Sequence, residues 1–315
     1  MPEHRIADTS TAGYPTLTLS CASTGVEATF APTVGMIGCS LRQRGQELLG
    51  QRGGLAKYAA SGSTMGIPLL HPWANRLNGL AYTLGGRTIV LDPHSPHLHR
   101  DAAGLPMHGL LGGYPGWRVI DRGAGDAAAR FSALLDFAAD PTLLAAFPFP
   151  HTLALEVVLR AATLTVTTTL RPTADLAVPI SFGFHPYLQL PGAERAAWHI
   201  EAPVRQRLLL DDHMIPTGQR EAIFIEPGPL ADRTFDDLFS DLAQPALFVL
   251  AGGGRRITVT FDRGFSFAQI YAPEREALIC FEPMTAPTNA LLSHDGLQLA
   301  APGGEYRAAF SITVG

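Results

Sequence analysis

The fold class is clearest in the segment HTLALEVVLRAATLTVTTTLRP, residues 151–172. Apolar residues alternate with small or polar ones on both sides of a turn near Ala161, and alternating threonine and valine suit a pleated, half-buried surface. The pattern predicts an antiparallel hairpin. Similar alternation recurs in TLTLSC (16–21), VEATFAP (26–32), RRITVTF (255–261), FSFAQIYAP (265–273) and EYRAAFSITV (305–314).

Helical patterns are few. The segment QELLGQRGGLAKYAA (46–60) is interrupted by glycines and predicts at most a short helix. The segment LADRTFDDLF (230–239) predicts another short helical turn, with Asp232 or Thr234 as its N-cap. The sequence shows no βαβ alternation, no glycine-rich phosphate loop and no internal repeat. It therefore predicts an all-β fold, a large antiparallel β-sandwich in one domain over residues 1–315, with few short helices.

Composition and charge restrict the class of protein. Hydrophobic residues make up 46% of the 315 residues and charged residues 16%, enough for a substantial core. The net charge is −5 and no basic block is interleaved with aromatic residues, so we expect no nucleic-acid partner. Apolar stretches fall short of the roughly 20 residues of a membrane helix, and the first residues lack a secretory pattern. Three sparse cysteines (Cys21, Cys39, Cys280) predict buried, reduced thiols in a cytoplasmic protein.

Two segments place basic residues among apolar ones. In GIPLLHPWANRLNG (66–79), Arg76 lies beside Asn75, and its rigid fork of donors can bind paired hydroxyls or a carboxylate. The alternative is a surface arginine near a turn. In LPMHGLLGGYPGW (105–117), glycines follow His108 and permit close approach of the backbone to a ligand. A lone histidine is also common as a hydrogen-bonded structural residue.

Two further segments contain candidate acid and base groups. In ISFGFHPYLQLPG (180–192), His185 has aromatic neighbours, and desolvation there would tune its pKa. In ALICFEPMTAPTNAL (277–291), Glu282 ends an apolar run that predicts a buried strand. A buried carboxylate is costly unless it is paired or used, which favours a functional role for Glu282.

Together these segments resemble the aldose 1-epimerase (galactose mutarotase) family, as a divergent member. The elements that match the family occur in its order across residues 66–283: Ala74-Asn75-Arg76-Leu77, His108-Gly109 with Trp117 downstream, His185-Pro186-Tyr187 with Leu190, Phe235-Asp236-Asp237-Leu238-Phe239, and Phe281-Glu282-Pro283. Leu110 replaces a usual second glycine, and the Phe-Glu-Pro context differs from that of dedicated galactose mutarotases.

The resemblance implies a galactose mutarotase-like supersandwich that interconverts the α and β anomers of a free hexose. It implies Glu282 as the base and His185 as the acid, with His185 protonated near neutrality and His108 near the ring oxygen. Arg76, Asn75 and Asp236 would bind sugar hydroxyls. The aromatic residues that could form walls of the site, each also a core candidate, are Trp73, Trp117, Tyr187 and Phe281. We expect no cofactor, no metal, a small sugar as the partner, and a monomer or homodimer.

Other functions are open from the sequence alone. A hexose-6-phosphate 1-epimerase would need clustered basic residues, for which Arg42, Arg44, Arg52 and Arg76 are candidates. A non-catalytic carbohydrate-binding sandwich is a second alternative, although the presence of both His185 and Glu282 argues against it. A glycosidase is a third alternative. Such an enzyme normally needs two carboxylates that flank the scissile bond, whereas the predicted site pairs one glutamate, Glu282, with a histidine.

One histidine-rich segment, DPHSPHLHR, could supply metal ligands from His94, His97 and His99. No cysteine or acidic residue follows this segment at a recognisable interval except Asp101. The prolines favour an irregular exposed loop or the rim of a site instead.

Overall fold

Antiparallel sheets form most of the molecule, as a computed structural model that describes residues 3–315 shows. The largest sheet runs in the spatial order β19 (Gly228–Pro229), β16 (His199–Glu201), β21 (Ala246–Gly252), β22 (Arg255–Arg263), β26 (Tyr306–Val314), β12 (Thr163–Pro172), β11 (His151–Arg160), β10 (Ala129–Asp136) and β9 (Arg118–Ala124). The predicted all-β fold with few short helices is confirmed.

Two smaller sheets complete the main layers. One runs in the order β1 (His4–Thr11), β2 (Tyr14–Cys21), β3 (Val26–Ala31), β4 (Ile37–Gln43) and β5 (Gln46–Glu47). The other runs in the order β18 (Pro216–Ala222), β17 (Val204–Leu210), β20 (Phe235–Leu242), β23 (Phe267–Ala272), β24 (Ile279–Met284), β14 (Gly183–Phe184) and β6 (Leu69–Leu70), with β15 (Tyr187–Leu188) also paired to β24. Short pairs are formed by β13 (Val178–Ile180) with β25 (Gln298–Ala300) and by β7 (Ala81–Leu84) with β8 (Arg87–Val90).

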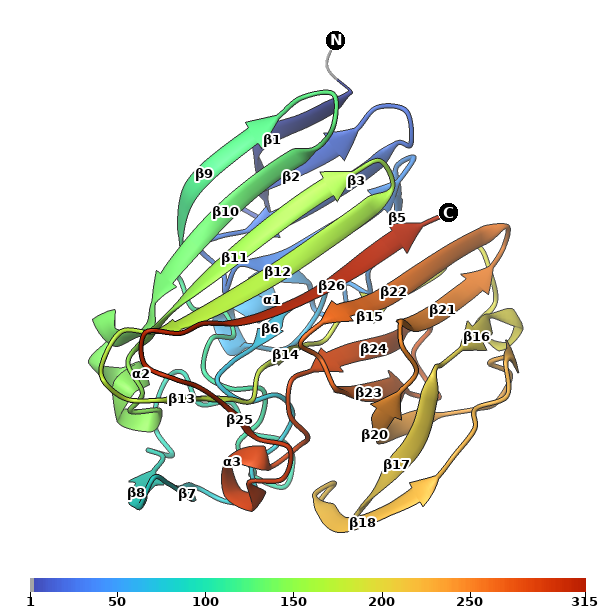
Figure 1. Cartoon of the computed structure of the whole chain (residues 1–315). Helices are drawn as coiled ribbons and strands as arrows, with labels where there is room; N and C mark the ends of the chain where they lie inside the picture. Colours follow the sequence, from blue (N-terminus) through green and yellow to red (C-terminus); the bar gives the residue numbers. More distant parts are fainter. Residues whose placement is uncertain (1–2) are drawn as a thin grey trace.

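The largest sheet packs against both smaller sheets. In Figure 1, β10 to β12 lie over β1 to β3, while β21 and β22 lie beside β23 and β24. Ring contacts join these layers: the centroids of Phe30 and Phe131 are 5.5 Å apart, and those of Phe248 and Phe281 are 5.2 Å apart. This is a sandwich in which one long sheet covers two shorter ones, and the apolar faces between them form the core.

The hairpin predicted over residues 151–172 is confirmed in detail. β11 and β12 pair until Arg160 faces Thr163, which leaves Ala161 and Ala162 as a two-residue turn. Ala161 has a φ of +49°, the left-handed conformation that tight hairpin turns require. The other five segments with alternating patterns also form strands: β2, β3, β22, β23 and β26.

The two helical predictions have different outcomes. The short helix α1 (Gly54–Ser61) falls in the predicted segment except for its last residue, and it ends at Gly62, whose φ of +65° permits the left-handed C-cap. The other helices are α2 (Pro141–Ala146) and α3 (Ala290–Ser293). The helical turn predicted in 230–239 is wrong, because its second half belongs to strand β20, paired with β17 on one side and β23 on the other. Asp232 and Thr234 therefore cap no helix.

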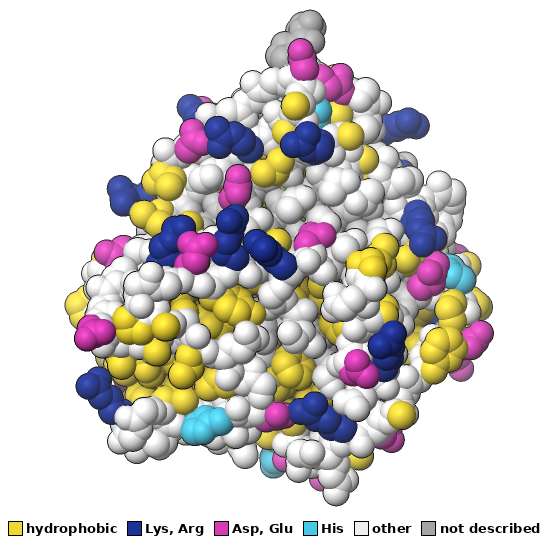
Figure 2. All heavy atoms as spheres, in the orientation of Figure 1, with side chains coloured by type: hydrophobic (Ala, Val, Ile, Leu, Met, Phe, Trp, Pro, Cys, Tyr) yellow, Lys and Arg dark blue, Asp and Glu magenta, His cyan; other side chains and the backbone are white. Residues whose placement is uncertain are grey.

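Three further observations concern the core and the surface. The three cysteines are free and buried, as predicted. Within residues 3–315, no helix is long and apolar enough to cross a bilayer. On the face that Figure 2 shows, Lys and Arg side chains lie interspersed with Asp and Glu side chains, so charges of the two signs offset each other locally.

Candidate active site

A cavity of about 650 Å³ is lined by all six residues that the sequence predicts for acid–base chemistry and sugar binding. Its walls come from the loop before α1, the segment after α1, the loop after β6, the loop between β8 and β9, strands β20, β23 and β24, and the region of β14 and β15. The predicted residues that line it are Asn75, Arg76, His108, His185, Asp236 and Glu282. The fold thus brings together residues that lie far apart in the sequence.

His185 and Glu282 meet inside this cavity. Glu282 belongs to β24, between β23 and β14, and His185 directly follows β14, where its backbone N–H donates to the Pro68 carbonyl. Nε2 of His185 lies 3.2 Å from Oε1 of Glu282, and the two side chains are 7% and 2% exposed. Oε2 of Glu282 and Nδ1 of His185 have no hydrogen-bond partner among the described residues. The pair can therefore exchange a proton and still interact with a further polar group.

Burial governs the protonation of this pair. Desolvation lowers the pKa of His185 well below its ordinary value, and electrostatic repulsion from Arg52 and from any proton on His108 lowers it further. Desolvation also raises the pKa of Glu282 well above its ordinary value; the Asp236 carboxylate adds to this, whereas Arg76 opposes it. The prediction that His185 is protonated near neutrality is therefore wrong for the free protein, because burial disfavours both charged forms. Burial therefore favours a protonated carboxyl beside a neutral imidazole over the ion pair.

His108 lies against His185 in a strained loop. The two imidazole centroids are 5.5 Å apart in an edge-to-face arrangement. Burial lowers the pKa of His108 to about 3, so its imidazole is neutral. His108 has a φ of +63° and Asn75 a φ of +55°, and the N–H of His108 donates to the Asn75 carbonyl over 2.8 Å. Left-handed non-glycine residues side by side are typical of functional sites, where the surrounding structure holds the strain.

The glycines that follow His108 approach the protein, not a ligand. Gly109 has a φ of +72°, and a Cβ atom there would lie 2.2 Å from the His71 carbonyl oxygen. Gly112 packs against the His99 ring, which a Cβ atom would approach to 2.9 Å. The predicted close approach to a ligand is therefore wrong, and the glycines instead let this loop pack tightly behind His108.

Arg76 is held by two neighbours. Its Nε donates to Oδ2 of Asp101 over 2.7 Å, and Nη1 donates to Oδ1 of Asn75 over 3.0 Å. The Arg76 side chain is only 14% exposed, which excludes the alternative of an ordinary surface arginine. Asp101 also accepts from the N–H groups of Ala103 and Leu105, so it fixes the loop and the guanidinium together.

Asp236 faces the cavity from β20. Water reaches its carboxylate, yet the walls around it desolvate the group and raise its pKa. Gln269 of β23 donates from Nε2 to Oδ1 of Asp236 over 2.7 Å and pairs across the sheet with Glu282. Sequence reasoning missed Gln269, although a lone amide in the apolar strand FSFAQIYAP was a usable signal.

The aromatic candidates divide between core and cavity. Tyr187 lines the cavity, whereas Trp73, Trp117 and Phe281 are buried in the core. Two cavity residues, Tyr271 and Arg100, were not predicted. Both lie in segments that the sequence analysis considered, Arg100 at the end of DPHSPHLHR and Tyr271 in FSFAQIYAP, but nothing in those segments indicates that their side chains face the cavity.

The histidine-rich loop forms part of the rim. Residues 92–100 are irregular, as predicted, and His99 lines the cavity. His97 turns away toward Asp140, with Nε2 3.6 Å from Oδ2, and His94 is exposed. In residues 3–315 no group of three or more His, Cys, Asp or Glu side chains is arranged to hold a metal ion.

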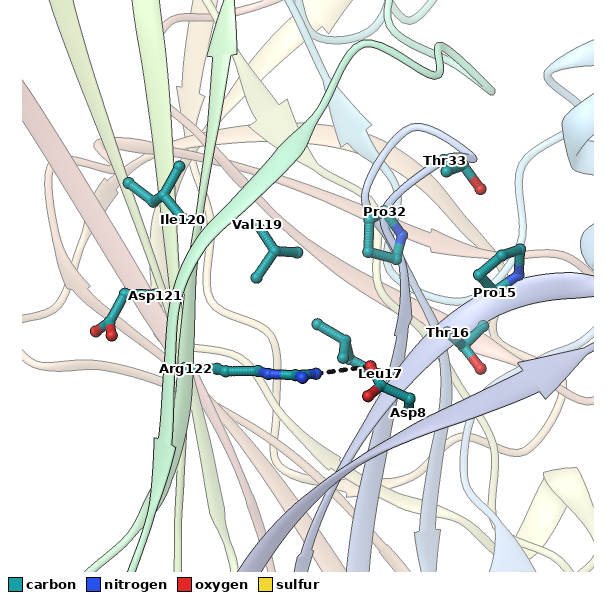
Figure 3. A pocket seen from close by; sticks show the side chains of 10 residues that line it. All are labelled: Asp8, Pro15, Thr16, Leu17, Pro32, Thr33, Val119, Ile120, Asp121 and Arg122. Carbon is teal, nitrogen blue, oxygen red and sulfur yellow. Dashed lines mark hydrogen bonds and ion pairs between the residues drawn. The ribbon is translucent and has the colours of Figure 1, made fainter.

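A second hollow of about 560 Å³ lies between β1, β2 and β9 (Figure 3). Val119, Leu17 and Pro32 face it, and Arg122 crosses it to form an ion pair with Asp8. Its ionisable groups are half exposed or more, and it contains no histidine beside a carboxyl group. Of these two hollows, only the first contains a histidine beside a carboxyl group.

Comparisons with known proteins agree with the fold and identify a family. Residues 32–313 match the family described as aldose 1-epimerase. No curated protein sequence matches the chain. Similar solved structures include a galactose mutarotase-like protein from Clostridium acetobutylicum, with a TM-score of 0.86 and 17% identity over 99% of both chains.

Two other structures show the same architecture. A protein from Synechocystis sp. PCC 6803 has a TM-score of 0.79 and 22% identity, covering 98% of this chain and 99% of its own. A galactose 1-epimerase from Lactobacillus acidophilus NCFM has a TM-score of 0.77 and 13% identity, covering 100% of this chain and 99% of its own. Because the family match extends over most of the sequence, this chain belongs to the aldose 1-epimerase family.

Proposed function

We propose that this protein is an aldose 1-epimerase that interconverts the α and β anomers of a free hexose by opening and closing the sugar ring. The observation that carries the proposal is the His185–Glu282 pair, with Nε2 and Oε1 3.2 Å apart in a sugar-sized cavity. One group of such a pair can accept a proton while the other donates one. Ring opening needs both events, and positioned acid and base groups each contribute typically about 10²- to 10⁴-fold.

In this mechanism the base removes the proton of the anomeric hydroxyl, and the C1–O1 bond becomes a carbonyl. The ring C1–O5 bond breaks, its electron pair stays on O5, and the acid protonates that oxygen. Rotation about C1–C2 presents the other face of the aldehyde, and closure returns both protons. Glu282 as base and His185 as acid require the shared proton to move to the imidazole when sugar binds. The positive charge of Arg76, which lowers the pKa of Glu282, favours that transfer.

The other cavity residues have binding roles in this proposal. Arg76 and Asn75 offer donors fixed in one orientation, and Asp236 offers a carboxylate held by Gln269. Neutral His108 can donate a hydrogen bond near the ring oxygen without placing a second cation beside His185. Fixed orientation of the sugar converts binding into rate.

The pairing of the arginines favours an uncharged sugar over a sugar phosphate. Arg52 and Arg76 line the cavity, but Glu276 and Asp101 respectively neutralise them. Arg100 also lines the cavity and donates to the Pro93 carbonyl. The remaining phosphate candidates, Arg42 and Arg44, lie outside the cavity, and Arg42 pairs with Glu47. A dianionic phosphate would have to compete with carboxylates for Arg52 and Arg76.

Polarimetry tests the proposal. Freshly dissolved α-glucose and α-galactose should reach their equilibrium rotation faster in proportion to the protein added. Their 6-phosphates should react more slowly and compete weakly. Faster turnover of the phosphates would favour the hexose-6-phosphate alternative. Sugar binding without any acceleration would favour a non-catalytic carbohydrate-binding sandwich.

A further inference from the structure

Three side chains form a stack at one wall of the cavity. The Tyr187 ring lies parallel to the His185 ring, with an interplanar angle of 6° and centroids 4.3 Å apart. The guanidinium carbon of Arg52 lies 5.3 Å from the Tyr187 ring centroid, and Nη1 donates to the Tyr187 hydroxyl over 3.3 Å. That hydroxyl also hydrogen-bonds Thr64. Tyr187 is therefore fixed between a cation and the imidazole that the proposed reaction uses.

Glu276 holds the outer side of Arg52. Its two carboxylate oxygens accept from Nε and Nη2 of Arg52 over 3.1 and 3.2 Å, a two-point geometry. The Arg52 and Glu276 side chains are 32% and 36% exposed, so the pair lies at the mouth of the cavity. Arg52 has a φ of +43°, so its backbone is held in an unusual conformation at this place.

Charges reach His185 from several elements. The groups that face it are Glu282 on β24, Tyr187 on β15, Tyr271 on β23, His108 on the loop between β8 and β9 and, beyond Tyr187, Arg52. A bare cation behind Tyr187 would oppose protonation of His185, and the field of Arg52 does lower the pKa of His185. A carboxylate bound to that cation offsets its field.

We propose that Arg52 and Glu276 are positioning residues for His185, with Arg52 clamping Tyr187 against the imidazole and Glu276 balancing the charge of the clamp. The proposal goes beyond the acid–base pair itself and uses the proposed epimerase activity as one of its readouts. The Arg52–Glu276 ion pair would then influence the pH at which His185 gains its proton, although neither residue contacts His185 or Glu282.

Single substitutions at the two positions should act in opposite directions. Glu276→Gln leaves Arg52 unbalanced and should shift the pH–rate profile to lower pH by about half a unit or more. Arg52→Met leaves Glu276 unbalanced and should shift it to higher pH by a similar amount. The double variant should return close to the native profile. Loss of packing alone would lower activity without opposite shifts.

The ion pair between Arg171 and Glu305 is a matched control, because it contains the same residue types and its glutamate has a similar exposure of 39%. Arg171→Met and Glu305→Gln should leave the pH profile unchanged. Shifts in one common direction, no shift at all, or equal shifts in the controls would overturn the proposal.

A second readout separates this proposal from the epimerase proposal. Two-dimensional NMR can follow the His185 imidazole, identified by the signal that disappears in His185→Gln. The His185 signal should respond to pH at lower values in Glu276→Gln and at higher values in Arg52→Met. If the native protein does not accelerate anomer exchange, the proposed function fails, while the NMR comparison still decides the role of the clamp. An unchanged His185 signal in every variant would reject that role.

Discussion

Gln269 donates a 2.7 Å hydrogen bond to Asp236 while it lies directly opposite Glu282 in the sheet. One amide on β23 thus connects the proposed sugar-binding carboxylate on β20 with the proposed base on β24. The site is built across adjacent strands of one rigid sheet, which fixes the separation of its polar groups.

Gln269→Leu should weaken sugar binding more than it slows the chemical step. The substitution keeps the side-chain volume and removes one hydrogen bond to a carboxylate, worth on the order of 1–2 kcal/mol, or about 5- to 30-fold in KM. Progress curves over a range of sugar concentrations separate KM from kcat. A fall in kcat with KM unchanged would contradict the binding role of Asp236.

His108→Asn should lower kcat about tenfold or more while the loop keeps its shape. Asparagine tolerates the left-handed backbone at this position, where φ is +63°, but its side chain is shorter than the imidazole. Circular dichroism and the denaturation midpoint test whether the fold is retained. Native kcat in a folded His108→Asn protein would remove His108 from the mechanism.

Acid should destabilise the fold through a buried histidine pair outside the cavity. Nε2 of His71 and Nε2 of His151 are 2.9 Å apart in the core. Burial lowers the pKa of both imidazoles from the ordinary value of 6.5, that of His71 well below it and that of His151 to about 4. The stability from these depressed pKa values is complete above about pH 6.5. This stability is lost as the pH falls toward 4, because the unfolded chain takes up protons first. The unfolding free energy then falls by about 1.4 kcal/mol per pH unit for each group.

His151→Gln should therefore show a shallower loss of unfolding free energy between pH 6.5 and 4 than the native protein. Urea denaturation at several pH values measures both slopes. Equal slopes would show that His151 does not titrate differently in the folded and unfolded states.

Local patterns predict the strands well and the polar pairing less well. The hairpin at 151–172 was predictable because alternation and a tight turn are encoded within one short segment. The segment at 230–239 was misread because the partners that make β20 a strand lie elsewhere in the chain.

We also propose one domain over residues 1–315, since a single cluster of buried apolar side chains extends from Leu17 to Val314.

For the site, motif resemblance identified residues that line one cavity, but not how they are charged. The proton position in the His185–Glu282 pair depends on burial from several strands, which no motif encodes. Arg52 was considered only as a phosphate ligand, because Glu276, its partner, is remote in sequence.

The exchange of α and β anomers by Glu282→Gln, followed by polarimetry on freshly dissolved sugar, tests the acid–base pair most directly. Glutamine keeps the shape of the buried side chain but can neither accept nor return the proton. We predict a folded protein whose catalysed exchange is slower by about 10²-fold or more. Near-native exchange by that variant would show that His185 and Glu282 are not the groups that open the ring.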